Sequence, residues 1–281
     1  MKVDAHQHFW RLADRQGHWP PASLAAIHRD FGPADLAPQL QAAGVDATVL
    51  VQSLPSVEDT RWMLSVAAET PWVRGVVGWV DFKAPDAAQQ IETLARNPLL
   101  KGLRPMLQDL PDNDWIADPA CDAAAVAMQR HGLVFDALVL PSQLRGLRRF
   151  ASRHPGLSIV IDHGAKPLIA SGQIHPWLGD MAALAALPHV HCKVSGLLTE
   201  AGERRDVVAL QPYVQTLWLL FGARRLLWGS DWPVLNLASD YAGWWQLAQE
   251  LAQRLYPSPQ PDDLRALFGD NAVRLYHIDP C

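Results

Sequence analysis

The stretch Val3-Asp4-Ala5-His6-Gln7-His8-Phe9-Trp10 runs from a short apolar segment directly into two histidines. Residues 2–5 are typical of the end of a buried strand. Because side chains alternate between the two faces of a strand, His6 and His8 are expected to point the same way. Two such imidazoles can offer nitrogen ligands to one metal ion, or acid and base groups to one substrate. The spacing alone is a weak signal, so its meaning depends on what the other strands carry at their ends.

Short apolar runs alternate with longer amphipathic segments along the whole chain. The runs are almost continuously hydrophobic, as in strands that are buried on both faces of a parallel sheet. The expected strands cover residues 2–5, 46–52, 73–80, 100–104, 134–140, 158–162, 190–195 and 225–228. The pattern predicts an α/β fold with a single (β/α)8 TIM barrel domain over residues 1–281, and a doubly wound open sheet is the alternative.

Composition and charge argue against nucleic-acid-binding, membrane-spanning and disulfide-rich proteins. The chain has 281 residues and a net charge of −5 without a basic run, which argues against a nucleic-acid partner. No apolar run approaches the ~20 residues of a membrane span, and the N-terminus lacks the apolar region of a signal peptide. The widely spaced Cys121, Cys192 and Cys281 suit a reducing compartment better than a disulfide scaffold. We therefore expect a cytoplasmic protein with a small-molecule partner and no membrane contact, and leave a homo-oligomer open.

Polar side chains gather at the C-terminal ends of the expected strands, where barrels of this kind carry their chemistry. They include His6, His8, Gln52, Asp81, Arg104, His163 and Asp231. Three imidazoles and one carboxylate around one point would form a ligand shell for a divalent metal ion, with zinc as the expected ion. The same groups would equally form a metal-free set of acids and bases, and the sequence leaves both open.

The remaining strand-end residues suggest ways of holding a substrate. Arg104 is a fixed cation with a planar fork of donors, suited to a carbonyl, a carboxylate or a developing oxyanion. Gln52 and Asp81 are candidates to bind sugar hydroxyls. Lys193 is set aside, because alternation along its strand leaves its direction undecided.

These motifs together resemble the amidohydrolase superfamily. The resemblance rests on the first His-x-His, on Asp-His-Gly-x-x-Pro at 162–167 and on Gly-Ser-Asp-Trp-Pro at 229–233. Further segments are RDFGPADL at 29–36, GVVGWVD at 75–81, KGLRPM at 101–106 and KVSGL at 193–197. They are similar to L-fuconolactonase-like sugar lactonases, within the lactonase branch of the amidohydrolase 2 TIM-barrel hydrolases. The resemblance covers nearly the whole chain.

By this resemblance, the superfamily's metal or catalytic positions are taken by His6, His8, His163 and Asp231. The expected fifth strand ends without a histidine, and the fourth ends in Arg104 rather than in a bridging lysine or glutamate. Both departures speak against a two-metal centre. One divalent ion or none is left open, because lactonases of this branch need not depend on a metal.

The resemblance implies a hydrolase that opens a sugar-acid lactone, such as L-fucono-lactone or a related aldonolactone, in sugar degradation. Asp231 would be the general base, while His163 and Arg104, or a held metal ion, would stabilise the tetrahedral oxyanion. Trp232 would pack on the sugar, together with Trp10 and Trp79.

Other activities are left as alternatives. They are a metal-dependent decarboxylase of an aromatic or unsaturated acid, a hydrolase of another cyclic ester such as a dicarboxylate lactone, and a non-catalytic sugar-binding barrel.

Overall fold

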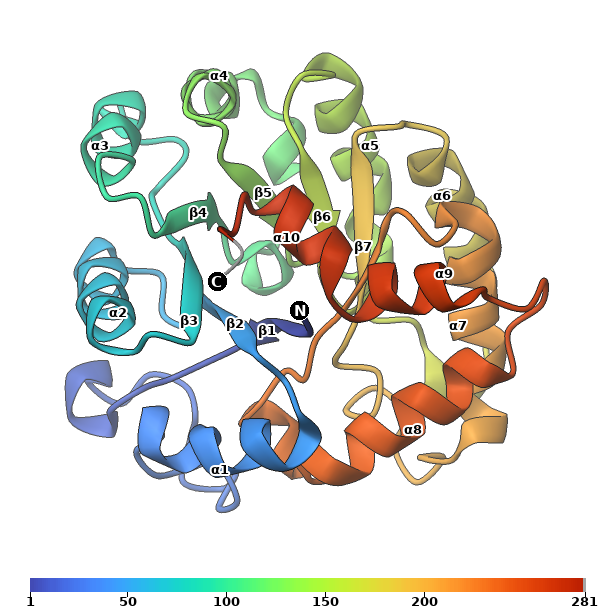
Figure 1. Cartoon of the computed structure of the whole chain (residues 1–281). Helices are drawn as coiled ribbons and strands as arrows, with labels where there is room; N and C mark the ends of the chain where they lie inside the picture. Colours follow the sequence, from blue (N-terminus) through green and yellow to red (C-terminus); the bar gives the residue numbers. More distant parts are fainter. Residues whose placement is uncertain (280–281) are drawn as a thin grey trace.

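Eight parallel strands enclose the axis of the molecule in the computed structural model, which describes residues 1–279 (Figure 1). Over this range the strands are β1 (Val3–Gln7), β2 (Ala47–Val51), β3 (Val73–Gly78), β4 (Leu100–Leu103), β5 (Val134–Ala137), β6 (Ile159–Ile161), β7 (Val190–Val194) and β8 (Leu226–Trp228). Each strand is hydrogen-bonded to the next in chain order. The predicted (β/α)8 barrel is confirmed, and this strand order excludes the open-sheet alternative. Cys281 and the predicted domain end at residue 281 lie outside the described residues.

Helices form a ring around the strands (Figure 1). The α-helices are α1 (Pro33–Ala43), α2 (Val57–Glu69), α3 (Ala87–Leu94), α4 (Asp122–Arg130), α5 (Leu144–Arg153), α6 (Trp177–Ala185), α7 (Val207–Phe221), α8 (Tyr241–Gln253), α9 (Pro261–Arg265) and α10 (Asn271–Leu275). Short 3-10 turns are η1 (Leu12–Arg15), η2 (Leu107–Asp109), η3 (Trp115–Ala117), η4 (Pro119–Cys121), η5 (Pro141–Gln143), η6 (Asp162–Ala165), η7 (Ile169–Ser171) and η8 (Val234–Leu237), and the π-helical turn η9 (Ala266–Asp270) joins α9 to α10. Within residues 1–279, no helix has the length and apolar character needed to traverse a bilayer.

The seam between the first and the last strand closes at the end of the barrel that carries the histidines. A parallel bridge joins Gln7 to Trp232. The backbone N–H of His8 donates to the carbonyl of Trp232 over 2.7 Å, and that of Asp231 donates to the carbonyl of His6 over 2.8 Å. The backbone of the predicted catalytic residues therefore makes the hydrogen bonds that close the sheet.

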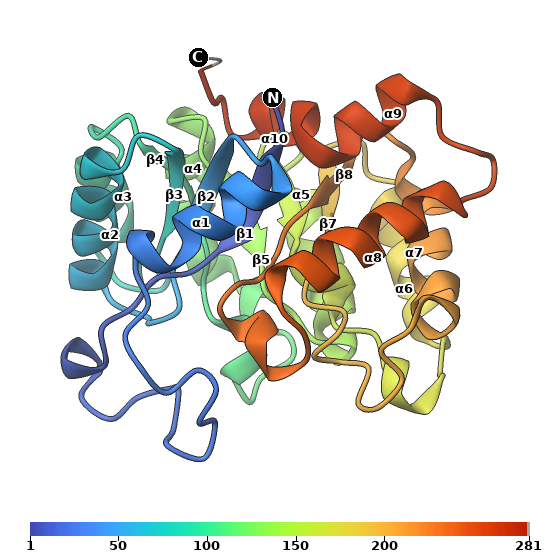
Figure 2. The ribbon, with the colours of Figure 1, turned by 60° about the horizontal axis from the view of Figure 1, so that its bottom comes forward.

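Small and branched apolar side chains fill the barrel interior, as strands buried on both faces require. The C-terminal segment adds to this inner core and closes the N-terminal end of the barrel. The inner core comprises Val3, Ala5, Ala47, Val49, Val51, Val77, Val134, Val160 and Leu227 from the strands, with Ala272, Leu275, Tyr276 and Ile278 from the C-terminal segment. Figure 2 shows α10 and the N-terminus at one end of the molecule, and the long loop of residues 10–32 at the other.

Candidate active site

Four predicted residues converge at the C-terminal end of the barrel. The Asp231 Oδ1 atom lies 3.2 Å from His8 Nε2 and 3.7 Å from the Nε2 atoms of both His6 and His163. All four side chains are buried. Ligand atoms of His6, His163 and Asp231 lie within 4.8 Å of one another. Around a tetrahedral zinc ion with bonds of ~2.1 Å, ligand atoms lie roughly 3.4 Å apart, so this spacing fits one divalent ion.

The hydrogen bonds of His8 favour a cation beside Asp231. His8 Nδ1 lies 2.7 Å from the carbonyl oxygen of Val51, which only accepts, so Nδ1 carries the proton. The neutral ring then turns a lone pair at Nε2 toward the Asp231 carboxylate. Burial lowers the pKa of His8, which disfavours a second proton on the ring. Two acceptors 3.2 Å apart are stabilised when a positive charge bridges them, and a divalent ion fits that need.

Backbone turns aim two of these residues into the site. His163 and Asp231 both have positive φ angles, of 54° and 58°, a region that costs a non-glycine residue about 1–2 kcal/mol. His163 is held by a 2.9 Å hydrogen bond between its Nδ1 and the Ser195 hydroxyl. Gly196 has a φ of 59°, and a Cβ there would lie 2.5 Å from His163 Nδ1. Only glycine therefore fits against the imidazole at this point.

Arg104 is buried beside the cluster. Its guanidinium donates to Asp162 Oδ2 over 3.2 Å and to the backbone carbonyl of Gln52. The Gln52 side chain donates back to the Arg104 carbonyl over 2.6 Å. Among the described residues, no side chain or carbonyl accepts from Arg104 Nε. The guanidinium is thus fixed by the protein and keeps one donor free.

A buried ionic network lies beneath the cluster, around Lys193, which the sequence pattern left without a predicted role. Lys193 Nζ is 2.5 Å from Asp136 Oδ2, 3.0 Å from Asp162 Oδ1 and 3.1 Å from His6 Nδ1. The Tyr276 hydroxyl donates to Asp136 Oδ2 over 2.7 Å. One signal was present, because Asp136 is a lone charge inside the apolar run VFDALVL at 134–140. Nothing in the sequence around Tyr276 indicated that its hydroxyl would bind Asp136.

A cavity of about 420 Å³ opens over these residues. Its floor holds His8, Arg104, His163 and Asp231. Its walls are Trp19, Ser53, Met106, Gln108, Asp109, Leu138, Lys166, Thr199, Glu200, Val234 and Leu237. The mixture of apolar and polar groups around a charged floor is typical of a site for a small polar ligand.

The residues predicted to bind substrate lie elsewhere. Gln52 is used in holding Arg104. Asp81 is exposed, and its carboxylate accepts from the backbone N–H of Lys83 over 3.0 Å. Trp232 is buried against Phe9 and Phe31. Within residues 1–279 none of the three lines the cavity, because Gln52 and Trp232 support the walls from behind and Asp81 ends a turn on the surface.

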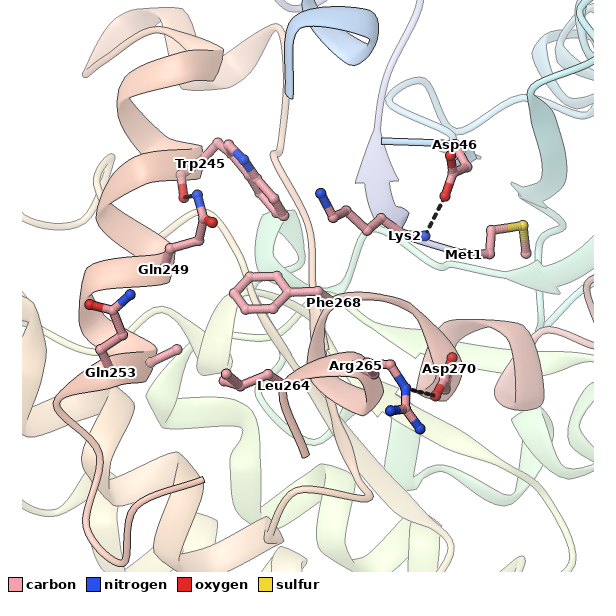
Figure 3. A pocket seen from close by; sticks show the side chains of 11 residues that line it. Met1, Lys2, Asp46, Trp245, Gln249, Gln253, Leu264, Arg265, Phe268 and Asp270 are labelled. Carbon is pink, nitrogen blue, oxygen red and sulfur yellow. Dashed lines mark hydrogen bonds and ion pairs between the residues drawn. The ribbon is translucent and has the colours of Figure 1, made fainter. Parts of the chain in front are cut away.

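A second cavity, of about 480 Å³, lies at the opposite end of the barrel (Figure 3). Trp245, Leu264 and Phe268 give it an apolar wall, with Lys2 and Arg265 nearby. Its lining contains no histidine, and the buried acid and base groups lie at the other end. The cavity over His8, His163 and Asp231 is therefore the candidate active site, although the cavity at the opposite end is larger.

Burial and neighbouring charges set the ionisation of the cluster. Burial lowers the pKa of His163 to about 4 and holds the pKa of His6 well below its ordinary value. Burial alone would raise the pKa of Asp231, but the His163 ring and the His8 ring outweigh it and bring the pKa below its usual range. At neutral pH the site therefore holds one carboxylate among neutral imidazoles.

A family model described as Amidohydrolase matches residues 3–278. The chain belongs to the amidohydrolase family. This amidohydrolase is 53% identical over 282 residues to an L-fucono-1,5-lactonase of Burkholderia ambifaria, covering 99% of this chain and 96% of the relative. It is 34% identical over 289 residues to an L-fucono-1,5-lactonase of Burkholderia multivorans, again with 99% and 96% coverage. The resemblance drawn from the sequence motifs is confirmed.

A solved structure extends the comparison to three dimensions. A crystal structure of an amidohydrolase from Burkholderia multivorans with bound Zn is 33% identical in sequence. The two folds agree with a TM-score of 0.91, over 99% of this chain and 100% of that chain. The barrel and its family are thus established by sequence and by fold.

Proposed function

We propose that this amidohydrolase opens the ring of L-fucono-1,5-lactone, or of a closely related sugar-acid lactone, to give the free acid. The observation that carries the proposal is a buried carboxylate, Asp231, which lies with Arg104 and two neutral imidazoles on the floor of one cavity, with the His6 imidazole behind it. The 53% identity to a relative named L-fucono-1,5-lactonase supports the choice of substrate.

Asp231 would accept a proton from the attacking water as the water oxygen bonds to the lactone carbonyl carbon. An ionised carboxylate is required, and the depressed pKa of Asp231 keeps it ionised. A carboxylate of low pKa is a weak base, so the neutral imidazole of His163, 3.7 Å away, gives the site a second acceptor. The collapse of the tetrahedral adduct breaks the ring C–O bond, and the proton held at Asp231 passes to the departing alkoxide.

Arg104 would bind the carbonyl oxygen as negative charge develops on it. A fixed donor costs no reorganisation when charge appears, which is the main source of oxyanion stabilisation. Its partners Asp162 and Gln52 hold the guanidinium in place before substrate binds. Arg104 lines the cavity, so its guanidinium lies at the edge of the space that the substrate would fill.

The proposal includes one divalent ion, with zinc as the expected one. His6, His163 and Asp231 would hold it, with His8 at the side of Asp231. When bound, such an ion supplies positive charge to the reacting carbonyl group. The lone pair that His8 turns toward Asp231 supports a positive charge at this point of the site.

Polar groups on the cavity wall would bind the sugar hydroxyls. Ser53 and Gln108 offer a hydroxyl and an amide, and the ion pair of Lys166 and Glu200, 3.3 Å apart, offers both a donor and an acceptor. Trp19 provides a ring on which a sugar face can pack. We assign substrate binding to these residues because they line the cavity.

Proton release from L-fucono-1,5-lactone and a panel of five- and six-membered sugar lactones tests the proposal, with and without a chelator. We expect turnover of the fucono-lactone, reduced by chelation and restored by zinc. Turnover that survives chelation would support the lactonase activity and show that it does not need the metal ion. Hydrolysis of no lactone would overturn the proposal, and carbon dioxide release from an aromatic acid would then establish the decarboxylase alternative. A cytoplasmic role in sugar degradation is part of the same proposal.

A further inference from the structure

Lys193 carries a charge where the fold needs only an apolar side chain. It lies in β7, its side chain points into the barrel interior, and it is fully buried. Taking an ammonium group out of water costs several kcal/mol unless each of its protons finds an acceptor. Three acceptors surround Nζ, on Asp136, Asp162 and His6, at 2.5, 3.0 and 3.1 Å. The three N–H groups of the ammonium are thus matched one to one.

The support for Lys193 comes from the far end of the barrel. The Tyr276 hydroxyl, just after α10, donates to the same Asp136 oxygen that binds Lys193. The Tyr276 side chain is buried in the inner core. A chain of hydrogen bonds therefore runs through the barrel interior, from the C-terminal helix to the first histidine of the site.

The contact between Lys193 and His6 determines where the imidazole keeps its proton. An ammonium group only donates, so the bond at His6 Nδ1 requires a lone pair on that atom. A neutral imidazole then carries its proton on Nε2, which faces Asp231 at 3.7 Å. Arg104 Nη1 lies 3.4 Å from the same Nε2 atom and, because a guanidinium only donates, favours the opposite tautomer. The opposite tautomer would place the proton on Nδ1, where Asp162 Oδ1 at 3.4 Å could accept it. That tautomer alone leaves Nε2 free to bind a metal ion.

We propose that Lys193 is a positioning residue of the active site. Held by Asp136 and Tyr276, it keeps His6 in the tautomer that is protonated on Nε2, and so limits how tightly the site binds a divalent ion. Asp162 at His6 Nδ1 and Arg104 at His6 Nε2, each 3.4 Å away, favour the metal-binding tautomer, and Lys193 opposes them over the shorter distance of 3.1 Å. The kinetic part of this inference rests on the proposed lactonase function, whereas the tautomer and the metal affinity do not.

The test uses a charge-balanced variant, because Lys193→Met alone would leave the buried Asp136 carboxylate without its cation and could unfold the protein. The double variant Lys193→Met with Asp136→Asn removes one charge of each sign. Tyr276→Phe removes only the supporting hydroxyl. Tyr213→Phe is the matched control, since its hydroxyl donates to the carbonyl of Gln173 over 3.2 Å, outside the network of Lys193, Asp136, Asp162 and Tyr276.

Zinc affinity, measured by competition with a chelating dye, and the nitrogen NMR signals of His6 in the metal-free protein are the main readouts. In the double variant we expect zinc to bind about 10–100-fold more tightly, and the His6 proton to move from Nε2 to Nδ1. Tyr276→Phe should change zinc affinity in the same direction by less, and Tyr213→Phe should not change it. With L-fucono-1,5-lactone, kcat of the double variant should fall about 10–100-fold with KM within about twofold.

A purely structural role would give a different result. Lower thermal stability with unchanged zinc affinity and an unchanged His6 tautomer in the double variant would overturn the proposal. NMR signals that place the His6 proton on Nδ1 in the wild-type protein would overturn the proposal as well. If the wild-type protein hydrolyses no lactone, the proposed function fails, but zinc affinity and NMR still decide the role of Lys193.

Discussion

The carboxylate of Asp231 lies within 3.7 Å of three imidazoles and is the group that we expect to activate water. Asp231→Asn keeps the size of the side chain and removes its basicity. General base catalysis contributes about 10²–10⁴-fold, so kcat for lactone hydrolysis should fall by that factor. Asp262→Asn, an exposed carboxylate at the start of α9, is the control and should keep wild-type rates. More than half of the wild-type turnover in Asp231→Asn would contradict this role.

His163 gives the molecule a defined response to acid. Its pKa falls from 6.5 to about 4 on folding, because burial disfavours the charged ring. Between these values the unfolded chain binds more protons than the folded one, so the free energy of unfolding decreases as the pH falls from 6.5 to 4. The loss should reach at most about 3 kcal/mol.

Urea unfolding at pH 7 and at pH 4.5 measures this loss, and His163→Asn, which cannot be protonated, should show less of it. Equal losses in the two proteins would show that His163 is not the group responsible. Initial rates should fall as the pH drops through about 4, when the ring becomes charged.

At the scale of single elements, the turn after β7 positions His163. In Gly196→Ala the new Cβ would lie 2.5 Å from His163 Nδ1, and the positive φ adds about 1–2 kcal/mol of strain. A displaced catalytic group can cost about 10²-fold in rate, so kcat should drop by roughly that factor. Gly132→Ala is the matched control, because Gly132 also has a positive φ but open space around it. It should lose similar stability and keep its activity.

The strands show what the sequence could and could not predict about the site. Polar residues at the C-terminal ends of the strands were expected to meet, and His6, Arg104, His163 and Asp231 do so. This expectation needed no knowledge of side-chain packing. It gave no direction for Lys193, since both faces of these strands are buried and either orientation satisfies the hydrophobic pattern. The side-chain direction became defined only when Asp136, Asp162 and His6 were placed around it.

For the whole molecule, Asn271 attaches the C-terminal helix α10 to the last strand of the barrel. The Asn271 side chain donates to the carbonyls of Ala223 and Leu226 over 2.7 Å each, and it is fully buried. Asn271→Ala would leave both carbonyls unpaired, at about 1–3 kcal/mol each. The free energy of unfolding should therefore fall by about 2–6 kcal/mol, measured from denaturant midpoints. A change below about 0.5 kcal/mol, the usual range of surface substitutions, would contradict this account.

The overall architecture was more predictable than the walls of the cavity. Alternating apolar runs are sufficient to indicate eight strands with helices between them, and the barrel follows. The walls come instead from loops, where no periodicity relates sequence to position. Trp19, Gln108 and Glu200 line the cavity for this reason without any advance signal, whereas Trp232, which has a prominent motif, lies behind the wall.

The seam at which the barrel closes is made by the backbones of His6, His8 and Asp231 themselves. These residues are far apart in the chain, since position 231 follows position 6 by 225 residues. On a ribosome, the first histidines therefore emerge long before their aspartate is synthesised. A nascent chain has the histidines but no site until β8 and the turn after it leave the exit tunnel. Closure of the sheet and assembly of the site thus depend on the same segment, which precedes α8, α9 and α10 in the chain, so a chain that ends before β8 has neither a closed barrel nor an assembled site.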